Sequence, residues 1–343
     1  MLDIDGSDGG GKLLRTALSL AAVTDTSFRI DRIRGSRPNP GLRAQHLAAV
    51  ELVAERCDAD VEGAELGAES LTFDPGDARR SPLEATVDTA GSITLLFDTV
   101  LPIAAADDEP LELTATGGTD VKWSPTIRYH QSVKLPMLAT WGLEADIDLV
   151  KTGFYPAGGG KATLKTVPSS LSRLELDERG ALSQVDIYSK AAADLAEQDV
   201  ADRQAAHARK RLDEMGIPTE IARVDYVPTQ SIGSSLLLCA TYDHSLAGFD
   251  ALGERGRTSE DVADDAVESF EAFHAGDAPV DVHMADQLLV FLALAGGTIR
   301  IPARTTHVRT NLDLIADFGS DIRSTRLPDG TFRVVASAHP AVR

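Results

Sequence analysis

The sequence predicts an α/β (α+β) fold: a large domain of three related helix-strand-helix-strand repeats with a smaller inserted α/β domain. The chain has 343 residues, 43% of them hydrophobic, which is enough for a large core and favours two domains over one. One order of predicted elements recurs three times, and a block that breaks this order separates the second copy from the third. We therefore assign residues 1–175 and 278–343 to the large repeat domain and residues 176–277 to the insert.

Each copy is predicted from its apolar spacing as a helix, a strand, a loop, a helix and two strands. In the first copy these are residues 9–22, 28–33, 34–41, 42–57 and a strand pair within 59–73. In the second they are residues 91–102, 111–115, 116–120, 125–141, 145–150 and 160–167. In the third they are a helix at 285–295, a strand from Thr298, the loop before His307, a helix to Phe318, and strands at 321–326 and 331–336. Stacking the copies would bury their apolar helices together and bring the three loops close, although a chance likeness is the alternative.

The insert follows no such order. It contains predicted strands at residues 184–189, 219–227 and 234–241, and predicted helices at 199–215 and 259–273. We expect these elements to form a small α/β unit of their own.

The chain is strongly acidic, with a formal net charge of −20 and 53 Asp and Glu residues against 33 Lys and Arg. A surface of this kind is typical of a very salty cytoplasm, where charge repulsion is screened over roughly 3 Å at 1 M salt. No apolar run reaches membrane-spanning length, the start lacks a basic signal-peptide region, and the chain has only 2 cysteines. These features predict a cytoplasmic protein, and they make the positions of its arginines informative.

His307 is the candidate catalytic residue. It stands in the first turn of a predicted helix that Thr305 or Thr306 can cap. The unpaired backbone N–H groups and the helix dipole disfavour a positive charge there, so we expect a neutral imidazole, which is a nucleophile. The same N–H groups would hold a phosphate that faces the ring. An exposed or capping histidine is the plainer alternative.

A glycine run precedes the first helix. Gly6-Ser-Asp-Gly-Gly-Gly-Lys12 almost matches the phosphate-binding loop G-x-x-x-x-G-K-[S/T], but Leu13 stands where the metal-binding hydroxyl belongs. Glycines at a helix start expose backbone N–H groups to an anion, and Asp8 beside them is placed to hold a divalent cation. A close helix packing contact would also explain the glycines.

A group of arginines lies in and after the first loop. Its members and their polar neighbours are Arg34, Arg37, Arg43, Gln45 and His46, with Arg15 one helical turn beyond Gly11. Guanidinium groups concentrated in so acidic a chain indicate bidentate binding of phosphates. Surface ion pairs with the abundant aspartates are the alternative.

The third repeat opens with His283, Met284, Ala285, Asp286 and Gln287. Polar groups at the start of an apolar helix suit a ribose or the edge of a base, although helix capping would explain them equally well. The chain contains no H-E-x-x-H, no paired C-x-x-C and no G-x-S-x-G. If the chain forms a covalent intermediate, His307 is therefore the best candidate.

Taken together, these segments resemble the RNA 3′-terminal phosphate cyclase family over essentially the whole chain. The matching pieces are residues 5–11 with Leu14-Arg15, 33–37, 40–46, 61–67, 90–92, 117–119, 153–160, 285–288, and Thr306-His307 with Thr310-Asn311. The family's fold is a large domain of three α/β repeats with a smaller inserted domain, which coincides with the layout above.

The resemblance implies ATP-dependent conversion of an RNA 3′-phosphate to a 2′,3′-cyclic phosphate, with a divalent metal, Mg or Mn. His307 matches the nucleophile that attacks the α-phosphorus of ATP and holds AMP. The AMP then passes to the RNA 3′-phosphate, and the neighbouring 2′-hydroxyl closes the ring. Cyclisation needs that hydroxyl, so RNA 3′-phosphate ends are the implied partners.

The same matching implies further roles. Residues 283–287 would line the nucleotide site with Asp98, and Asp8 would sit near the metal. The residues that would face ATP phosphates or the RNA end are Arg15, Arg34, Arg37, Arg43, Gln45 and His46. Three positions depart from the pattern: Asp8 replaces the glutamate common in bacterial members, Asp98 replaces a frequent glutamine, and His283 replaces a common tyrosine.

Two other functions compete with the cyclase. A non-catalytic cyclase-like protein in ribosome assembly or RNA binding would lack the histidine, and the Thr-His-x-x-Thr-Asn setting of His307 argues against it. An enolpyruvyl transferase has a similar repeat architecture, but the chain contains no motif that distinguishes that class.

Overall fold

Four sheets of four strands organise the described part of the chain, and three of them share one strand order. The computed structural model describes residues 1–88 and 90–341. The first of the three sheets runs β1 (Leu2–Asp5), β2 (Phe28–Asp31), β4 (Leu71–Asp74), β3 (Asp60–Glu62). The second runs β5 (Leu83–Thr86), β6 (Leu111–Gly117), β8 (Gly160–Thr166), β7 (Ala145–Lys151). The third runs β9 (Leu174–Leu176), β14 (Gly297–Ile301), β16 (Phe332–Ala336), β15 (Ile322–Arg326).

Helices from the three segments pack together beside these sheets. They are α1 (Gly10–Thr24), α2 (Ala44–Cys57), α3 (Ile93–Ala106), α8 (Val282–Ala295) and α9 (Thr306–Asp317). α1 packs against α2, α3 and α9, while α3 also packs against α8. Leu14, Ala17, Leu18 and Ala21 recur at helical spacing on α1 and are fully buried, so the apolar periodicity of the sequence is what drives this contact. The predicted mixed α/β fold class is confirmed.

The opening strand of each of these sheets was not expected. β1, β5 and β9 pair in parallel with β2, β6 and β14, respectively. β5 buries only Leu83, and β9 has 3 residues, so neither is long enough to show the alternation by which a strand is recognised in sequence. Parallel pairing with a distant strand, rather than local pattern, determines their conformation.

The helix expected at residues 125–141 is broken into three pieces. α4 (Ile127–Tyr129) passes into a π-helical segment, η1 (His130–Lys134), and then into α5 (Leu135–Ala139). π-helical turns inside helices are rare and occur frequently at functional sites. Here the segment carries two buried cationic or titratable side chains, those of His130 and Lys134.

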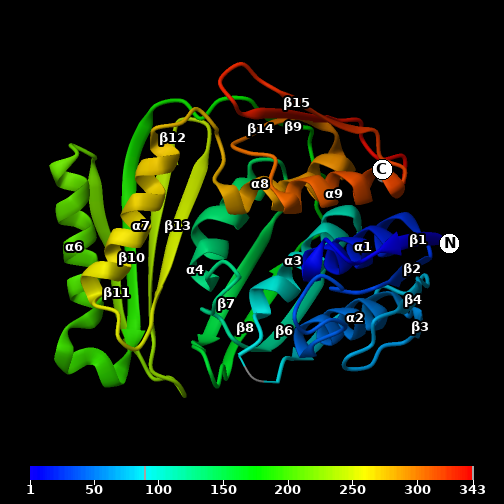
Figure 1. Cartoon of the computed structure of the whole chain (residues 1–343), viewed down its shortest axis with the longest axis horizontal. Coiled ribbons are helices and arrows are strands. Elements are labelled where there is room, and N and C mark those ends of the chain that lie inside the picture. Colours follow the sequence, from blue (N-terminus) through cyan, green and yellow to red (C-terminus); the bar gives the residue numbers. More distant parts are fainter. Residues whose placement is uncertain (89, 342–343) are drawn as a thin grey trace.

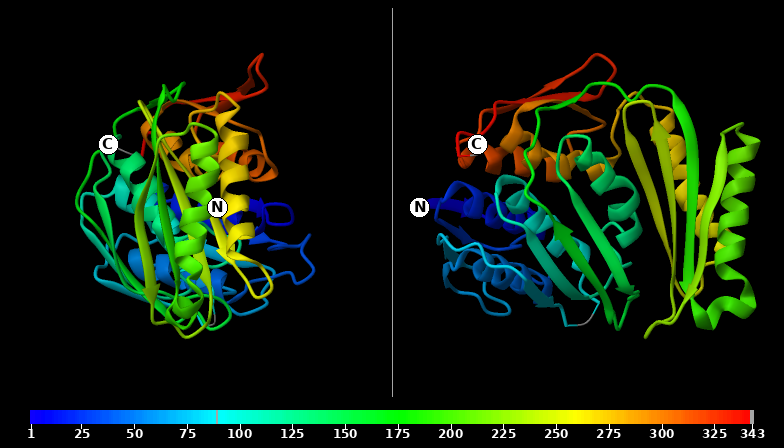
Figure 2. Two further views of the ribbon diagram at one scale, coloured as in Figure 1. Left: turned by 90° about the vertical axis from the view of Figure 1, so that its left-hand side faces the viewer. Right: turned by 180° about the vertical axis from the view of Figure 1, so that it is seen from behind.

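The fourth sheet lies at one end of the molecule, opposite both chain termini (Figure 1 and Figure 2). It runs β11 (Thr219–Val227), β10 (Leu182–Ala192), β12 (Ser234–Tyr242), β13 (Leu246–Gly253), and β13 was not predicted. The short 3-10 helix η2 (Ala193–Gln198) leads from β10 into α6 (Val200–Glu214), and α7 (Ser259–His274) follows β13. The side chains between this sheet and its two helices form a hydrophobic cluster separate from that of the rest of the chain. The division into domains at residues 175 and 277 stays a prediction.

Asp281 joins this fourth sheet to the helices of the larger part. Its carboxylate caps α8 by accepting hydrogen bonds from the backbone N–H groups of His283 at 2.8 Å and Met284 at 2.9 Å. It also accepts from the Tyr129 hydroxyl at 2.9 Å and from the N–H of Gly248 in β13 at 3.0 Å. One buried carboxylate therefore ties together α8, α4 and β13.

None of the helices in the described part of the chain is long and apolar enough to span a membrane.

We predict that Asp281→Ala lowers the free energy of unfolding by about 2 to 4 kcal/mol, because it removes a helix cap and leaves buried donors without an acceptor. Urea unfolding at constant high salt measures the change. Asp313→Ala is the matched control, since Asp313 is exposed on α9 and forms only a 4.0 Å ion pair with Arg309. A loss in Asp281→Ala no larger than that in the control would contradict the prediction.

Candidate active site

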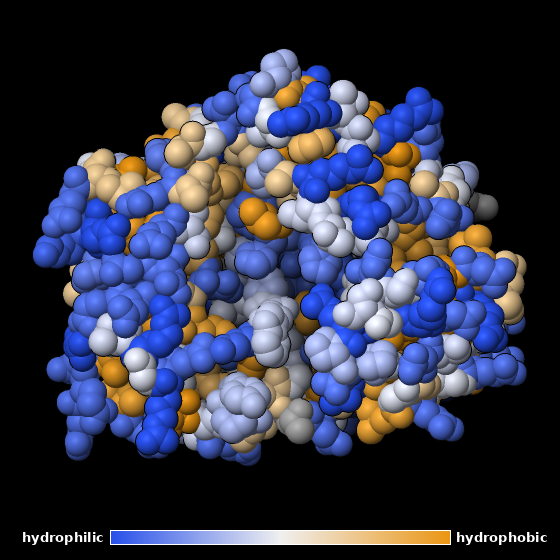
Figure 3. Space-filling model, in the orientation of Figure 1, coloured by the Kyte–Doolittle hydropathy of each residue, from blue (hydrophilic) through white to orange (hydrophobic). Residues whose placement is uncertain are grey.

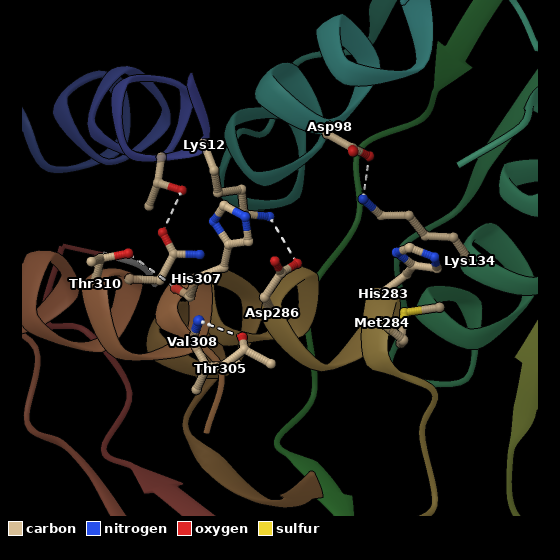
Figure 4. A network of polar contacts seen from close by, with 12 residues as sticks. Lys12, Asp98, Lys134, His283, Met284, Asp286, Thr305, His307, Val308 and Thr310 are labelled. Atoms are coloured by element: carbon tan, nitrogen blue, oxygen red, sulfur yellow. Dashed lines mark hydrogen bonds and ion pairs between the residues drawn. The ribbon is translucent and has the colours of Figure 1, made fainter. Parts of the chain in front are cut away.

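His307 projects from the first turn of α9. The Thr305 side chain caps this helix by accepting a hydrogen bond from the Val308 N–H at 3.2 Å, which confirms that Thr305 is one of the two expected caps. One turn further along, Asn311 Oδ1 accepts a hydrogen bond from Thr16 Oγ1 of α1 at 3.1 Å. His307 is exposed, and its imidazole points from α9 toward the start of α1 (Figure 4). The buried Thr16–Asn311 bond thus sets how the two helix starts face each other.

Lys12 lies at that start of α1, one turn before Thr16. Its ammonium group pairs with Asp286 of α8 at 3.3 Å, and both side chains are largely buried. Figure 4 shows this pair beside the His307 imidazole. Lys12 was not among the predicted site residues, although it occupies the lysine position of the near phosphate-binding loop.

A hollow of about 310 Å³ lies between α1, α3 and α8. Its lining is rich in cationic and polar side chains and consists of Lys12, Arg15, Thr16, Ser19, Asp98, Pro102, Lys134, Gln287 and Val290. In the space-filling view the surface is hollowed between the fourth sheet and α1 (Figure 3). Lys12 pairs with Asp286 and Lys134 with Asp98, so Arg15 is the cation of this hollow that forms no ion pair within the described residues.

Asp98 is held by two buried cationic or titratable side chains in this hollow. His130 Nε2 lies 2.7 Å from Asp98 Oδ1, and the Lys134 ammonium contacts the same oxygen. Burial raises the pKa of Asp98, but Lys134, His130 and Lys12 outweigh it, so the pKa falls well below its usual range. Burial lowers the pKa of Lys134, while Asp98 opposes the shift. The predicted contact of Asp98 with a nucleotide stays a prediction, and its Oδ1 is already occupied.

The glycine turn and the arginine loop come together. A Cβ added at Gly10 would lie 3.5 Å from Arg37 Nη2. A Cβ added at Gly11 would lie 2.1 Å from His46 Nε2 and 3.2 Å from Arg15 Nη1. No side chain fits at Gly11 without moving His46. The two glycines therefore let three predicted phosphate-binding side chains reach the start of α1.

The arginines of this cluster have no carboxylate partners. Among the residues that the structure describes, ion pairs involve neither Arg15, Arg34, Arg37 nor Arg43. Arg34 instead donates to the carbonyl oxygens of Asn39 at 2.8 Å and Gly41 at 3.0 Å, which closes its own loop. Burial and then Arg43 and Arg37 lower the pKa of Arg34, as expected for cations crowded together. The alternative of surface ion pairs does not describe these four side chains.

His46 is a neutral hydrogen-bond donor within the cluster. Burial, followed by Arg15, Arg34 and Arg43, lowers the pKa of His46 to about 3. Its Nδ1 accepts a hydrogen bond from the backbone N–H of Arg43 at 3.2 Å. The single ring proton of the neutral form is then on Nε2, the atom that faces Gly11. His46 can therefore donate to an oxygen at the glycine turn without adding charge.

Gln45, in the first turn of α2, connects the end of the arginine loop to the start of α3. Its Oε1 lies 3.4 Å from the backbone N of Ser92, directly before α3. Asp8 accepts a hydrogen bond from Ser36 of the arginine loop at 3.2 Å. Gln45 and Asp8 therefore join the arginine loop to the start of α3 and to the glycine turn, respectively.

Residues 283–287 divide between the surface of α8 and its buried side. The His283 ring lies edge-on to Tyr129 with ring centres 6.2 Å apart, whereas Met284 and Ala285 are buried. Gln287 Oε1 and Asn311 Nδ2 are buried and lack a hydrogen-bond partner within residues 1–88 and 90–341.

The described residues contain no group of three or more His, Cys, Asp or Glu side chains that could hold a metal ion. Asp8 at the glycine turn is a single carboxylate. Mg²⁺ is commonly bound by one or two carboxylates together with substrate phosphates, so this donor set fits a cation that arrives with a phosphorylated substrate.

Comparisons with known proteins show the family of the chain. The family model described as RNA 3′-terminal phosphate cyclase matches residues 7–322. A protein named RNA 3′-terminal phosphate cyclase from Halobacterium salinarum is 45% identical over 98% of this chain and 99% of its own length. Proteins of the same name from Saccharolobus islandicus and Methylococcus capsulatus are each 39% identical, over 93% and 99% of this chain and 94% and 99% of their own lengths. The enolpyruvyl transferase NikO from Streptomyces tendae is 12% identical, with a TM-score of 0.41 over the whole chain and half of that protein.

We predict that His46 makes stability depend on pH. Its pKa is lowered to about 3 in the folded protein, whereas an unfolded histidine titrates near about 6.5. Between these values the unfolded chain binds the extra proton, so the folded state loses stability as the pH falls. The expected difference between pH 7 and pH 5 is about 1 to 2 kcal/mol larger in the wild type than in His46→Gln. Urea unfolding at both pH values measures it, and equal pH dependence in the two proteins would refute the assignment.

Proposed function

Because the chain belongs to the RNA 3′-terminal phosphate cyclase family, we propose that it converts an RNA 3′-phosphate to a 2′,3′-cyclic phosphate with ATP. The observation that supports this most is the exposed His307, on a capped helix start beside the cationic hollow. A neutral imidazole attacks phosphorus, and the cations around it compensate the charge of a triphosphate.

In the first step, an imidazole nitrogen of His307 forms a bond to the α-phosphorus of ATP, and the bond from that phosphorus to pyrophosphate breaks. Lys12, Arg15 and the backbone N–H groups at the start of α1 would hold the departing phosphates. Asp8, with the triphosphate, would hold a divalent cation, Mg or Mn, which supplies positive charge to the phosphate oxygens. Residues 283–287 would line the nucleoside side of the site.

In the second step, an oxygen of the RNA 3′-phosphate takes AMP from His307. Arg34, Arg37, Arg43, Gln45 and His46 would orient that terminal phosphate, which is consistent with their position at the glycine turn. In the third step, the adjacent 2′-hydroxyl attacks the activated phosphate, the ring closes, and AMP leaves. A vicinal hydroxyl has a high effective molarity, so positioning supplies much of the catalysis here.

We predict that the enzyme forms a covalent adduct when incubated with α-labelled ATP and a divalent metal in high salt. A phosphoramidate is acid-labile and alkali-stable, and His307→Ala should abolish it because no other nucleophile replaces the imidazole. His244→Ala is the matched control, since His244 is exposed in the turn between β12 and β13. No adduct in the wild type would favour the non-catalytic RNA-binding alternative.

We also predict that an RNA with a 3′-phosphate but a 2′-deoxy terminal sugar stops after AMP transfer. The activated end then accumulates as an RNA-adenylate, because the attacking hydroxyl is missing. Gel analysis with a labelled RNA separates this species from the cyclic product that the matching ribose RNA yields. Release of a cyclic end from the deoxy substrate, or no adenylate at all, would contradict the proposed order of steps.

A further inference from the structure

A second basic pocket lies between the inserted sheet and α4. Val185, Ile187, Leu236 and Leu238 belong to the hydrophobic cluster under α6 and α7. Side chains alternate between the faces of a strand, so the intervening residues of β10 and β12 face away from those helices. The register aligns Tyr188 with Arg223 and Leu237, and Lys190 with Asp225 and Ser235.

These aligned residues form one wall of a pocket of about 290 Å³, and α4 forms the other. The lining residues that matter here are Arg128 from α4 and Tyr188, Lys190 and Arg223 from the sheet. The Arg128 guanidinium lies over the Tyr188 ring, 5.2 Å from its centre. The pocket is thus built from α4 and from three strands, β10, β11 and β12, and it shares no lining residue with the hollow near His307.

The three cations of this pocket differ in their partners. Lys190 pairs with the buried Asp120 at 2.8 Å, and Arg223 pairs with Asp225 at 2.5 Å. Within residues 1–88 and 90–341, no carboxylate forms an ion pair with Arg128. Burial, followed by the nearby Arg223, lowers the pKa of Arg128, while Tyr188, Asp225 and Asp120 oppose the shift. An arginine stays charged at any working pH, so an anion in the pocket would be attracted to Arg128.

An exposed tryptophan stands on the loop that borders the pocket. The loop starts at Asp120, which bonds Lys190 at 2.8 Å and Ser235 Oγ at 3.0 Å, and it ends at Thr126, another lining residue. Trp123 lies halfway along it, is 96% exposed and has a positive φ of 65°. A large apolar ring held in water in a rarely populated backbone conformation is unexplained by packing. Proteins that bind single-stranded nucleic acid combine such rings with basic grooves.

Resting on the cyclase function proposed above, we propose that this pocket binds the RNA strand upstream of its 3′ end, with a phosphodiester on Arg128 and a base on Trp123. Arg128 is two residues before His130, which bonds Asp98 in the hollow. The same short helical segment therefore borders both sites, and one RNA strand would contact both of them.

The test is fluorescence anisotropy with the full chain at constant salt and without ATP. The probes are single-stranded RNAs with a 3′-phosphate, one of about 15 nucleotides and one of about 3. Arg128→Ala should weaken binding of the long RNA about tenfold and reduce the slope of log affinity against log salt by about 0.7, with the short RNA unaffected. Trp123→Ala should weaken the long RNA about five- to tenfold. Trp123 is almost fully exposed, so this second variant should fold normally.

Arg209→Ala is the matched control, because Arg209 is exposed on α6 and pairs only with Asp213 at 3.6 Å. Formation of the AMP adduct should be unchanged in Arg128→Ala. This readout separates the upstream RNA site from the proposed cyclase chemistry, because a wild-type protein that forms no adduct would contradict only the chemistry. Unchanged affinity for the long RNA in both variants, or equal losses for long and short RNA, would overturn the upstream site. Binding of inorganic phosphate that Arg128→Ala abolishes, with RNA affinity unchanged, would overturn it as well.

Discussion

The close approach of His46 to Gly11 is the contact on which the candidate site depends. A single methyl group at Gly11 would lie 2.1 Å from the ring nitrogen, far inside any tolerated distance. Because Gly11 has no side chain, the arginine loop and α2 can pack against the N-terminus of α1. The unpaired backbone N–H groups at that helix start favour an anion. The parts of the site that are predicted to bind an anion are therefore brought together by the lack of a side chain at Gly11 as well as by the arginines.

The arginines around the glycine turn form a local concentration of positive charge, although the chain as a whole is acidic. The chain carries a net charge of −20, and most of its exposed cations are matched by neighbouring carboxylates. The four arginines around the glycine turn are not, within the part of the chain that the structure describes. Burial, followed by the neighbouring arginines, lowers the pKa of both Arg34 and His46, which keeps the imidazole neutral.

The fourth sheet is part of the scaffold that holds the hollow near His307. Asp281 binds α8, Tyr129 and Gly248 at once, and Asp250 of β13 accepts a hydrogen bond from the N–H of Thr126 at 2.7 Å. Burial raises the pKa of Asp250, opposed by His283 and the bonds from Thr126. These contacts fix the short segment from Thr126 to His130, which borders the hollow on one side and the second basic pocket on the other. A ligand in the hollow and a ligand in the second basic pocket would thus both lie against the segment from Thr126 to His130.

Local features of the chain determined the helix that carries His307, its threonine cap, the glycine turn and the arginine loop, because each depends on residues within a few positions of one another. The apolar spacing likewise determined the main helices. Tertiary structure decided the rest. The opening strands β1, β5 and β9 exist because a distant strand pairs with them. Lys12 meets Asp286, and Lys134 meets Asp98, across 274 and 36 positions, respectively. Burial and the lack of a carboxylate partner are properties of the packed chain, so no stretch of sequence read alone could reveal which arginines are left to bind an anion.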